Sequence, residues 1–528
     1  MALNVLKIFL LSIALITGEQ VLAQMSLQWA RCYNGPANDW DAALAIAVDD
    51  SGFVYVTGVD RGIGTGQDYA TIKYASDGSV VWIKRFAGPS NNNEGGTDIA
   101  VDAEQNVYVT GKFTVKYNDN GDTIWVRDWI DPFYAAVRIV LGDSVFYLGG
   151  SSLGDYATIK YDANGNLLWQ RLYSGPASDT DQLNDLVLDS QGSVIVTGQS
   201  RGLGTNWDFA TVKYSPNGDT VWVRRYSGPA PPQEPNTDFA YAIAVDDADN
   251  VYVTGWSKST TGIPQCFTIK YSPNGDSLWG HRYPSGGTIG YAGYDALYDR
   301  GFIYVVARAN GFDDTLLKYD LDGNLIWSRA YVSNHTFATN QPRLAVDTAG
   351  NIYMTSVNSV GRSDFIVLKY SPNGTRLWQF AYPDSGANTG NNVYAIAVDK
   401  ASNVYLTGES SGWVCPGGSY DYLTFKLSQD PTHVGQLPEL PNHYELRQNY
   451  PNPFNATTSI EYALPRRGFV DLRVFDILGR EVSRLVYEER SAGIHQVQWL
   501  ADDFSSGLYF CRLSVSGYTQ VRKLLLLR

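Results

Sequence analysis

The chain has little of what several functional classes require. Its 528 residues include only 4 cysteines and 5 histidines, and neither a CxxC pair nor an HxH or HExxH pattern occurs. So few cysteines exclude a scaffold built on disulfides. The spacing also predicts no zinc site and no nucleophile that depends on a histidine. We therefore predict no catalytic residue, no metal site and no evident cofactor from these residue types.

Positive charge is also scarce. The 40 Lys and Arg residues face 54 Asp and Glu residues, which gives a formal charge of −14. Binding to nucleic acid depends on clustered Lys and Arg that neutralise phosphates, so we expect no nucleic-acid partner. Helical periodicity is missing as well, whereas Tyr, Val, Thr and turns bounded by Gly are abundant. This combination favours an all-β fold.

Only one long apolar run occurs, and it lies near the N-terminus. Lys7 precedes the run IFLLSIALITG, and the stretch ends in VLA before Gln24. A basic head, an apolar core and small residues at the cleavage site are typical of a secretory signal peptide. We expect residues 1–23 to be removed by cleavage between Ala23 and Gln24. No other run is long enough to predict a transmembrane segment.

The following 400 or so residues repeat. A string like VYVTG recurs eight times, and a second strand-like run such as DYATIKY follows each copy. Seven of these runs end in a Tyr that precedes a Trp by eight residues, as Tyr74 precedes Trp82, with Asp-Gly or Asn-Gly between them. Such a pair between apolar runs predicts a hairpin with a type I′ turn. The fixed position of the tryptophans predicts that they dock between repeat units.

Each unit is predicted to contain four strands, because a further apolar run such as YAIAVD precedes most VYVTG strings. Four strands in about 40–50 residues form one blade of a β-propeller. The eighth unit lacks its tryptophan strand, and the segment LQWARCYNGP at the start of the mature chain matches that strand. We therefore predict an eight-bladed β-propeller over residues 24–430, closed by an N-terminal strand.

The repeat also resembles a known family. The pattern AxAVDxxGNVYVTG, followed by ATIKY and NGxxxW, is similar to the SBBP β-propeller repeats of bacterial surface and secreted proteins over roughly residues 27–430. The resemblance implies a propeller but no single activity.

A second module follows the repeats. Residues 431–443 form a linker rich in proline, and residues 444–528 contain alternating runs that predict a small Ig-like β-sandwich. This module resembles the type A C-terminal sorting domain of type IX secretion substrates. The matching positions are Asn449, Pro451, Asn452, Pro453, Phe454, Asn455, Gly479, Arg480, Gly493, Gly507, Tyr509 and Lys523. The resemblance implies export by the type IX machinery to the outside or the outer surface of the cell. It also implies removal of the domain by the sortase of that system, followed by release or attachment to surface lipopolysaccharide.

Insertions in the repeat fall between the second and third strands and between units. These two loop sets share one face of a propeller, and variable loops are where binding residues usually lie. We expect their acidic residues to form a rim around the channel mouth, namely Asp39, Asp41, Glu94, Asp98, Asp181, Asp185 and Asp238. The rim could bind calcium or a carbohydrate. The other reading is that these acids only keep a secreted protein soluble.

Four tryptophans lie outside the repeat position, namely Trp40, Trp207, Trp256 and Trp413. Aromatic side chains among polar loop residues predict contact with a sugar or a protein. We therefore predict a module that binds a glycan or a protein ligand, as in adhesion. The alternative is a propeller enzyme, either a quinoprotein-type dehydrogenase or a polysaccharide lyase. The sequence shows no adjacent cysteine pair for the first and no convincing His, Tyr and Arg group for the second.

Overall fold

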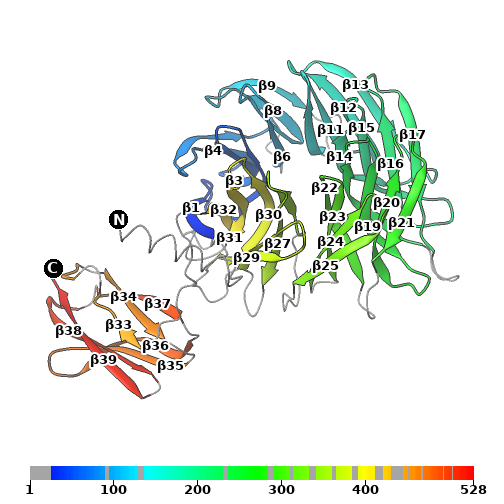
Figure 1. Cartoon of the computed structure of the whole chain (residues 1–528). Coiled ribbons are helices and arrows are strands. Elements are labelled where there is room, and N and C mark those ends of the chain that lie inside the picture. The colour runs from blue at the N-terminus through cyan, green and yellow to red at the C-terminus, as the bar shows by residue number, and fades with distance from the viewer. Residues whose placement is uncertain are drawn as a thin grey trace, which may run out of the picture. The chain divides into compact units, whose positions relative to one another are not determined.

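The computed structural model describes residues 25–527 apart from 90–93, 129–135, 230–235, 284–289, 310–312, 332–340, 359–363, 383–390, 411–419, 430–443, 450–451, 456, 465–467, 491–492, 502–503 and 516. Every helix or strand within these ranges is a β-strand (Figure 1). Accordingly, no helix of the described residues could span a membrane. The chain divides into two compact units, Gln24–Asp430 and the part from Pro431 onward, and each is described by itself. The predicted signal peptide, its cleavage site at Ala23 and Gln24, and the linker 431–443 lie outside the described residues.

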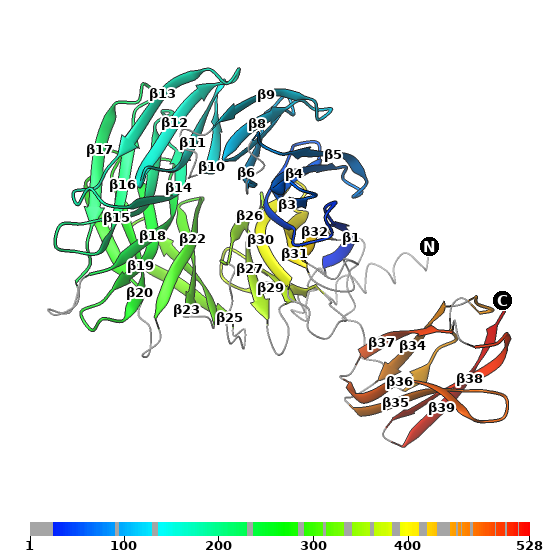
Figure 2. The same ribbon diagram turned by 180° about the vertical axis from the view of Figure 1, so that it is seen from behind.

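The first unit consists of eight antiparallel sheets of four strands (Figures 1 and 2). The first four sheets are β2 (Ala42–Val48), β3 (Val54–Gly62), β4 (Gly66–Tyr74) and β5 (Val80–Phe86); β6 (Gly96–Val101), β7 (Val107–Gly111), β8 (Phe113–Tyr117) and β9 (Thr123–Asp128); β10 (Ala136–Gly142), β11 (Val145–Ser152), β12 (Asp155–Asp162) and β13 (Leu167–Tyr173); β14 (Asp181–Leu188), β15 (Val194–Arg201), β16 (Trp207–Tyr214) and β17 (Thr220–Tyr226).

The other four sheets are β18 (Asp238–Val245), β19 (Val251–Lys258), β20 (Pro264–Tyr271) and β21 (Ser277–Arg282); β22 (Tyr291–Asp299), β23 (Phe302–Ala309), β24 (Asp314–Asp320) and β25 (Leu325–Tyr331); β26 (Leu344–Val346), β27 (Ile352–Asn358), β28 (Asp364–Tyr370) and β29 (Arg376–Ala381); β30 (Asn391–Val398), β31 (Val404–Ser410), β32 (Asp421–Gln429) and β1 (Met25–Tyr33).

Seven sheets take their strands from one continuous segment, whereas the last sheet takes them from two. Its order is β1-β32-β31-β30, so the strand nearest the N-terminus stands beside the last strand of the unit. The two strands pair antiparallel, with Tyr33 opposite Tyr422. The first strands of neighbouring sheets pack on one another, and β2 packs on both β6 and β30. These contacts bring the start of the unit against its end.

The first strand of most sheets carries a β-bulge at the same place. The register with the second strand shifts between Ala43 and Ala45 in β2, between Gly96 and Asp98 in β6, and at the matching position of β10, β14, β18, β22 and β30. A bulge inserts one unpaired residue and changes the direction of the side chains beside it. The residues after the bulges form the candidate site described below.

The repeat tryptophans lie between neighbouring sheets, which confirms the predicted docking. The indole Nε1 of Trp169 donates a hydrogen bond to the carbonyl oxygen of Pro216 in the next sheet at 3.0 Å, and its ring is 8% exposed. The ring also covers Gly218 of that turn, where a Cβ atom would lie only 2.8 Å from the indole. Because Trp169 fills this space, the turn has room for glycine alone.

The hairpin turn that contains the equivalent glycine of the first sheet, Gly78, differs from the predicted type I′ turn. In the first sheet, the Gly78 N–H donates to the Ala75 carbonyl at 2.9 Å, and the register shifts by one residue between Lys73 and Tyr74. Only Gly78 has a positive φ, of 81°, and Asp77 before it does not. These features define a type I turn followed by a glycine bulge. The prediction was wrong because Asp-Gly and Asn-Gly pairs suit both kinds of turn.

The second unit has seven strands in two sheets. One sheet has the order β33 (Glu445–Leu446), β34 (Thr457–Leu464), β37 (Gly493–Leu500), and the other β36 (Glu481–Arg490), β35 (Gly468–Phe475), β38 (Gly507–Val515), β39 (Tyr518–Leu526). Side chains from both sheets share one hydrophobic core, with Trp499 and Phe454 fully or almost fully buried in it.

Candidate functional site

The loops between sheets adjoin the hairpin loops of the preceding sheet. The Glu94 N–H donates to the Gln67 carbonyl at 2.8 Å, and the Asn206 N–H donates to the Asn236 carbonyl at the same distance. The first bond links the loop after β5 to the β3–β4 hairpin, and the second links the β15–β16 hairpin to the loop before β18. Both variable loop sets therefore gather on one side of the sheets.

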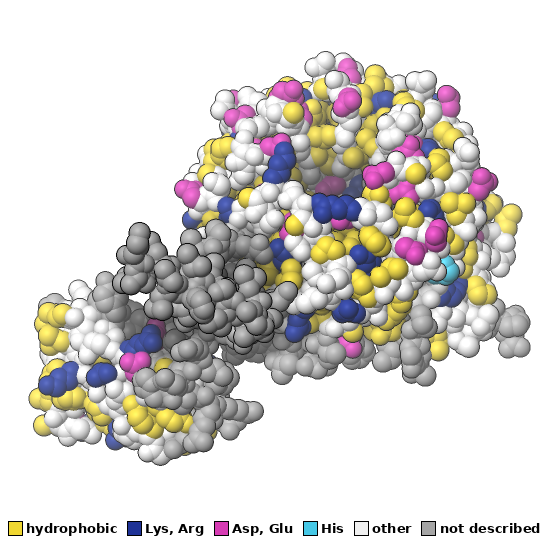
Figure 3. Space-filling model, in the orientation of Figure 1, with side chains coloured by type: hydrophobic (Ala, Val, Ile, Leu, Met, Phe, Trp, Pro, Cys, Tyr) yellow, Lys and Arg dark blue, Asp and Glu magenta, His cyan; other side chains and the backbone are white. Residues whose placement is uncertain are grey.

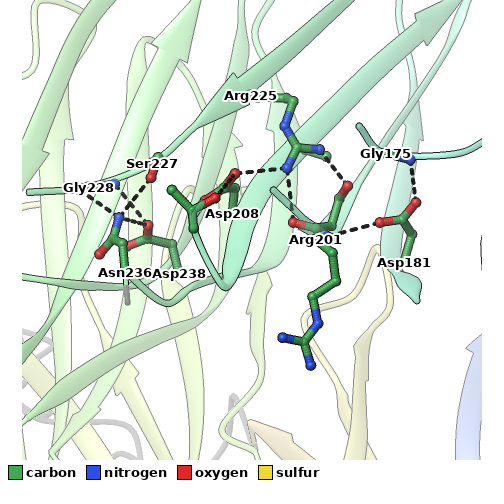
Figure 4. A network of polar contacts seen from close by, with 12 residues as sticks. Gly175, Asp181, Arg201, Asp208, Arg225, Ser227, Gly228, Asn236 and Asp238 are labelled. Atoms are coloured by element: carbon green, nitrogen blue, oxygen red, sulfur yellow. Dashed lines mark hydrogen bonds and ion pairs between the residues drawn. The ribbon is translucent and has the colours of Figure 1, made fainter. Parts of the chain in front are cut away.

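Several acidic residues of the predicted rim are internal supports of these loops. Asp181 and Asp238 are fully buried. Asp181 accepts hydrogen bonds from the backbone N–H groups of Gly175 at 2.5 Å and Arg201 at 3.0 Å (Figure 4). Asp238 accepts one from the Gly228 N–H at 2.8 Å. Carboxylates that are buried and bonded in this way hold the loop backbone and are not presented to a ligand at the surface.

Three further acids of the predicted rim lie nearby. Asp41 is fully buried and accepts hydrogen bonds from the N–H groups of Gly35 and Arg61. Burial raises the pKa of Asp41 to about 6. Glu94 is 4% exposed, with Oε1 at 3.7 Å from the Lys112 ammonium group. Asp39 is exposed and pairs with the Arg61 guanidinium at 3.3 Å. Asp39 alone among these three is on the surface.

Asp98 and Asp185 lie elsewhere, in a cavity between the first strands of the sheets. The cavity measures about 220 Å³, and three further charged residues, Arg138, Asp295 and Arg343, join the two aspartates in lining it. The space-filling view shows a hollow in the middle of this unit with acidic and basic side chains inside it (Figure 3). Five different sheets thus contribute one charge each, and we name this group the charged ring.

The three aspartates of the charged ring join neighbouring sheets. The Oδ2 atoms of Asp98, Asp185 and Asp295 accept hydrogen bonds from backbone N–H groups of the next sheet at 3.0, 3.1 and 2.9 Å. Arg138 Nε donates to Asp185 Oδ1 at 3.1 Å. Burial raises the pKa of Asp98 and of Asp295, although Arg138 and Arg343, respectively, oppose the shift. The aspartates therefore have a structural role that the sequence alone did not indicate.

Sequence reasoning missed Arg138, Asp295 and Arg343 because it collected only acidic loop residues. A signal for them exists in the repeat, at the residue just after each bulge or at its equivalent. In chain order this position holds Ala45, Asp98, Arg138, Asp185, Ala242, Asp295, Arg343 and Ala395. Side chains at one repeat position on successive sheets lie around a common centre, so the charges in this column predict the charged ring.

A second group consists of aromatic side chains. We name as the aromatic strip the half-buried residues Trp207, Phe239, Trp256, Tyr241 and Tyr294. Ring centroids are 6.1 Å apart for Trp207 and Phe239, 4.9 Å for Phe239 and Trp256, and 5.3 Å for Tyr241 and Tyr294. Trp256 Nε1 donates to the Tyr241 hydroxyl at 3.1 Å. Two of the predicted loop tryptophans thus belong to one continuous surface.

Of the other two predicted tryptophans, only Trp40 lies within the described residues, and it is not part of the strip. Trp40 is half-buried, and its Nε1 donates to Glu409 Oε2 at 2.8 Å. Trp413 lies outside the described residues. No group of three or more His, Cys, Asp or Glu side chains in the described ranges is arranged to hold a metal ion.

The predicted sorting motif is hydrogen-bonded to β39, the last strand of the second unit. Asn452 Oδ1 accepts a hydrogen bond from the Leu525 N–H at 2.9 Å, and the Phe454 N–H donates to the Leu525 carbonyl at 3.0 Å. The Phe454 ring is 2% exposed and lies 5.5 Å from that of Trp499. Asn449 Nδ2 donates to Thr458 Oγ1 at 2.9 Å. The motif is therefore part of the fold of this unit.

The remaining motif positions lie in turns and strand ends. Gly479 has a φ of 77° in the β35–β36 turn, and Arg480 pairs with Asp476 at 2.7 Å. The Tyr509 hydroxyl donates to the Ser505 carbonyl at 2.8 Å. Pro453 and Asn455 flank Phe454 and are exposed, Gly493 and Gly507 begin β37 and β38, and Lys523 is exposed on β39. Pro451 lies outside the described residues.

Three solved structures resemble the chain at low identity. PorZ, described as an essential surface component of the type-IX secretion system of Porphyromonas gingivalis, is 13% identical with a TM-score of 0.33, over 92% of this chain and 74% of PorZ. Polysaccharide lyase Uly1 is 11% identical with a TM-score of 0.39, over 78% and 96%. A eukaryotic initiation factor is 9% identical with a TM-score of 0.39, over 66% and 79%. None of these likenesses is close enough to support an argument about function.

Two family models match parts of the chain. Residues 221–262 match the β-propeller repeat SBBP, and residues 448–527 match the secretion system C-terminal sorting domain. No curated protein matches the sequence. The second match covers the unit in which the Asn452 and Phe454 contacts were found. The chain therefore carries a β-propeller repeat of the SBBP family and ends in a C-terminal sorting domain of the type IX secretion system.

Proposed function

We propose that the eight sheets are the blades of one closed propeller. The pairing of β1 with β32 and the packing of β30 on β2 support closure between the last blade and the first. Trp29 supports it further, because its Nε1 donates to the Ser76 carbonyl across this boundary as Trp169 does to Pro216 across another. Closure gives every sheet a neighbour on both faces, and a propeller leaves only short, protected sheet edges.

We also propose that this exported propeller binds a glycan through the aromatic strip. The observation that carries the proposal is the continuous row of half-buried rings from Trp207 to Tyr294. Aromatic rings pack against the C–H faces of sugars, and a few polar groups then fix the orientation of the ligand. A binding or adhesion role at the cell surface or in the medium follows from this arrangement.

The sorting domain accounts for the route by which the protein is exported. A domain of this kind implies contact with the type IX machinery and export to the cell surface or beyond. In our proposal, a signal peptidase cleaves between Ala23 and Gln24, and a sortase later removes the C-terminal domain. The propeller is then released or attached to surface lipopolysaccharide.

A glycan array with the mature chain, residues 24–528, tests the binding proposal. We expect specific signals that fall when Trp256→Ala shortens the aromatic strip. Tyr487→Ala is the matched control, since Tyr487 is a 58% exposed aromatic residue of the other unit, and it should leave the signals unchanged. A blank array with folded protein would contradict the proposal and favour a protein ligand.

Two additional measurements test for a role of calcium and for lyase activity. Repeating the array with calcium and with a chelator tests whether a cation takes part, because binding through bound calcium would disappear in the chelator. Shortening of a bound glycan on incubation would instead favour the polysaccharide lyase.

A further inference from the structure

The two arginines of the charged ring differ in their ion-pair contacts. Arg138 has the Asp185 carboxylate at 3.1 Å. Arg343 has no such partner. Within the described residues, no carboxylate lies within 4 Å of its guanidinium, and the hydrogen bond that Arg343 does donate comes from its backbone N–H, to Thr355 Oγ1 at 2.8 Å. The Arg343 guanidinium therefore lines the cavity without a carboxylate in ion-pair contact, and Asp295 acts on it only from beyond that distance.

The cavity wall next to Arg343 offers no carboxylate that could pair with its guanidinium. The two sheets that follow it place Ala395 and Ala45 at the ring position, and Ile396, Ile46 and Tyr394 complete this side of the cavity. Asp295, in the preceding sheet, already accepts hydrogen bonds from the N–H groups of Ala296 and Leu344 at both oxygens. Burial and the positive charge of Arg138 lower the pKa of Arg343, although the three aspartates of the charged ring oppose the shift. A desolvated cation without a partner is unfavourable, and a bound anion would relieve it.

The size and position of the cavity limit what this anion can be. About 220 Å³ accommodates one small molecule or one terminal residue of a longer ligand. The aromatic strip ends at Tyr294, which is the residue before Asp295 in the sequence. The guanidinium forms two parallel hydrogen bonds with a carboxylate, and the small apolar wall suits the C–H face of a sugar ring.

We propose that Arg343 binds the carboxylate of an acidic sugar residue at the end of a glycan held by the aromatic strip. This inference rests on the proposed glycan binding and names the sugar class. The Arg343 guanidinium binds the carboxylate, and Ala45 and Ala395 contact the sugar ring. Arg138 and the aspartates keep the opposite wall of the cavity polar.

Titration calorimetry on residues 24–528 tests the proposal by comparing two methyl glycosides and three variants. We expect methyl glucuronide to bind, and methyl glucoside to bind about tenfold more weakly or worse because it lacks the charge. Arg343→Gln should weaken glucuronide binding by a similar factor, and Arg343→Lys should restore part of it. Arg376→Gln is the matched control, since Arg376 is exposed on β29 of the same sheet.

Three results would overturn the inference. They are equal affinity for the acidic and the neutral glycoside, unchanged glucuronide binding in Arg343→Gln, and binding of a glucose 6-sulfate as tight as that of the glucuronide. The last would mean a general anion site. Thermal unfolding of each variant shows whether it is folded, and Arg343→Lys carries the test if Arg343→Gln is not. Neutral glycans that bind an array through Trp256 while glucuronide does not bind would reject this inference and keep the proposed function.

Discussion

The indole Nε1 of Trp29 lies 3.0 Å from the carbonyl oxygen of Ser76, to which it donates a hydrogen bond. Trp29 stands on β1 in the last sheet, and Ser76 lies in a turn of the first. The Lys426 ammonium group donates to the same oxygen at 3.1 Å from β32. The boundary between the two ends of the unit therefore uses the same contacts as the other boundaries, and its strength can be measured.

Replacing Trp29 should weaken this boundary. Its side chain is 6% exposed and fills the space over Gly78. We expect Trp29→Ala to lower the free energy of unfolding by about 3–5 kcal/mol, as measured by chemical denaturation. Trp256→Ala removes a half-buried tryptophan of β19 that does not lie between sheets in the repeat position, and it should cost clearly less. Equal losses for the two variants would contradict a special role of Trp29.

Adding a methyl group at Gly218 should disturb the same kind of contact. The residue has a φ of 83°, and a Cβ would lie 2.8 Å from the Trp169 ring. Gly204 is the control, since its φ is 80° but nothing lies within 4 Å of a Cβ there. Both alanine variants incur backbone strain of about 1 kcal/mol. The melting temperature should fall further for Gly218→Ala, and equal melting temperatures would show that the indole moves aside without cost.

The stability of the first unit should depend on Asp41 between pH 4 and pH 6. Burial raises the pKa of Asp41 to about 6 in the folded chain, whereas an unfolded aspartate titrates near about 3.9. Between these values the folded chain binds more protons at this site, so its contribution makes the free energy of unfolding fall as the pH rises. Asp41→Asn removes that contribution. Denaturation curves at several pH values should therefore show a wild-type-minus-variant difference that declines from pH 4 to pH 6, and a constant difference would refute the assignment.

Export should depend on the fold of the second unit. Phe454 is 2% exposed and contacts Trp499, so Phe454→Ala should destabilise that unit by about 3–5 kcal/mol. We expect less of the protein in the medium and on the cell surface of a bacterium with type IX secretion, measured by immunoblot of cell fractions. Leu478→Ser is the control, because Leu478 is 72% exposed and its loss should leave the fold intact. Normal export of Phe454→Ala would show that the motif is read without the folded unit.

The repeat made much of the architecture predictable, since periodic tryptophans and glycines mark strands and turns directly. Chemistry was harder to predict, because burial depends on contacts between sheets. Asp181 and Asp185 are four residues apart, yet one supports a loop and the other lines the cavity. Arg138 and Arg343 were missed for a related reason. Their place in the charged ring can be recognised only when one repeat position is compared across all sheets.

The last sheet has a consequence for how the protein matures. Its strands come from residues 25–33 and 391–429, and Tyr422 donates a hydrogen bond to Ala70 across 352 positions of the chain. Contacts so distant in sequence form late, because the loop between them must close first. A chain that is synthesised from its N-terminus has β1 early but still lacks β32. The chain up to Gln429 must therefore be present before this sheet can assemble, and the N-terminal strand has no partner until then.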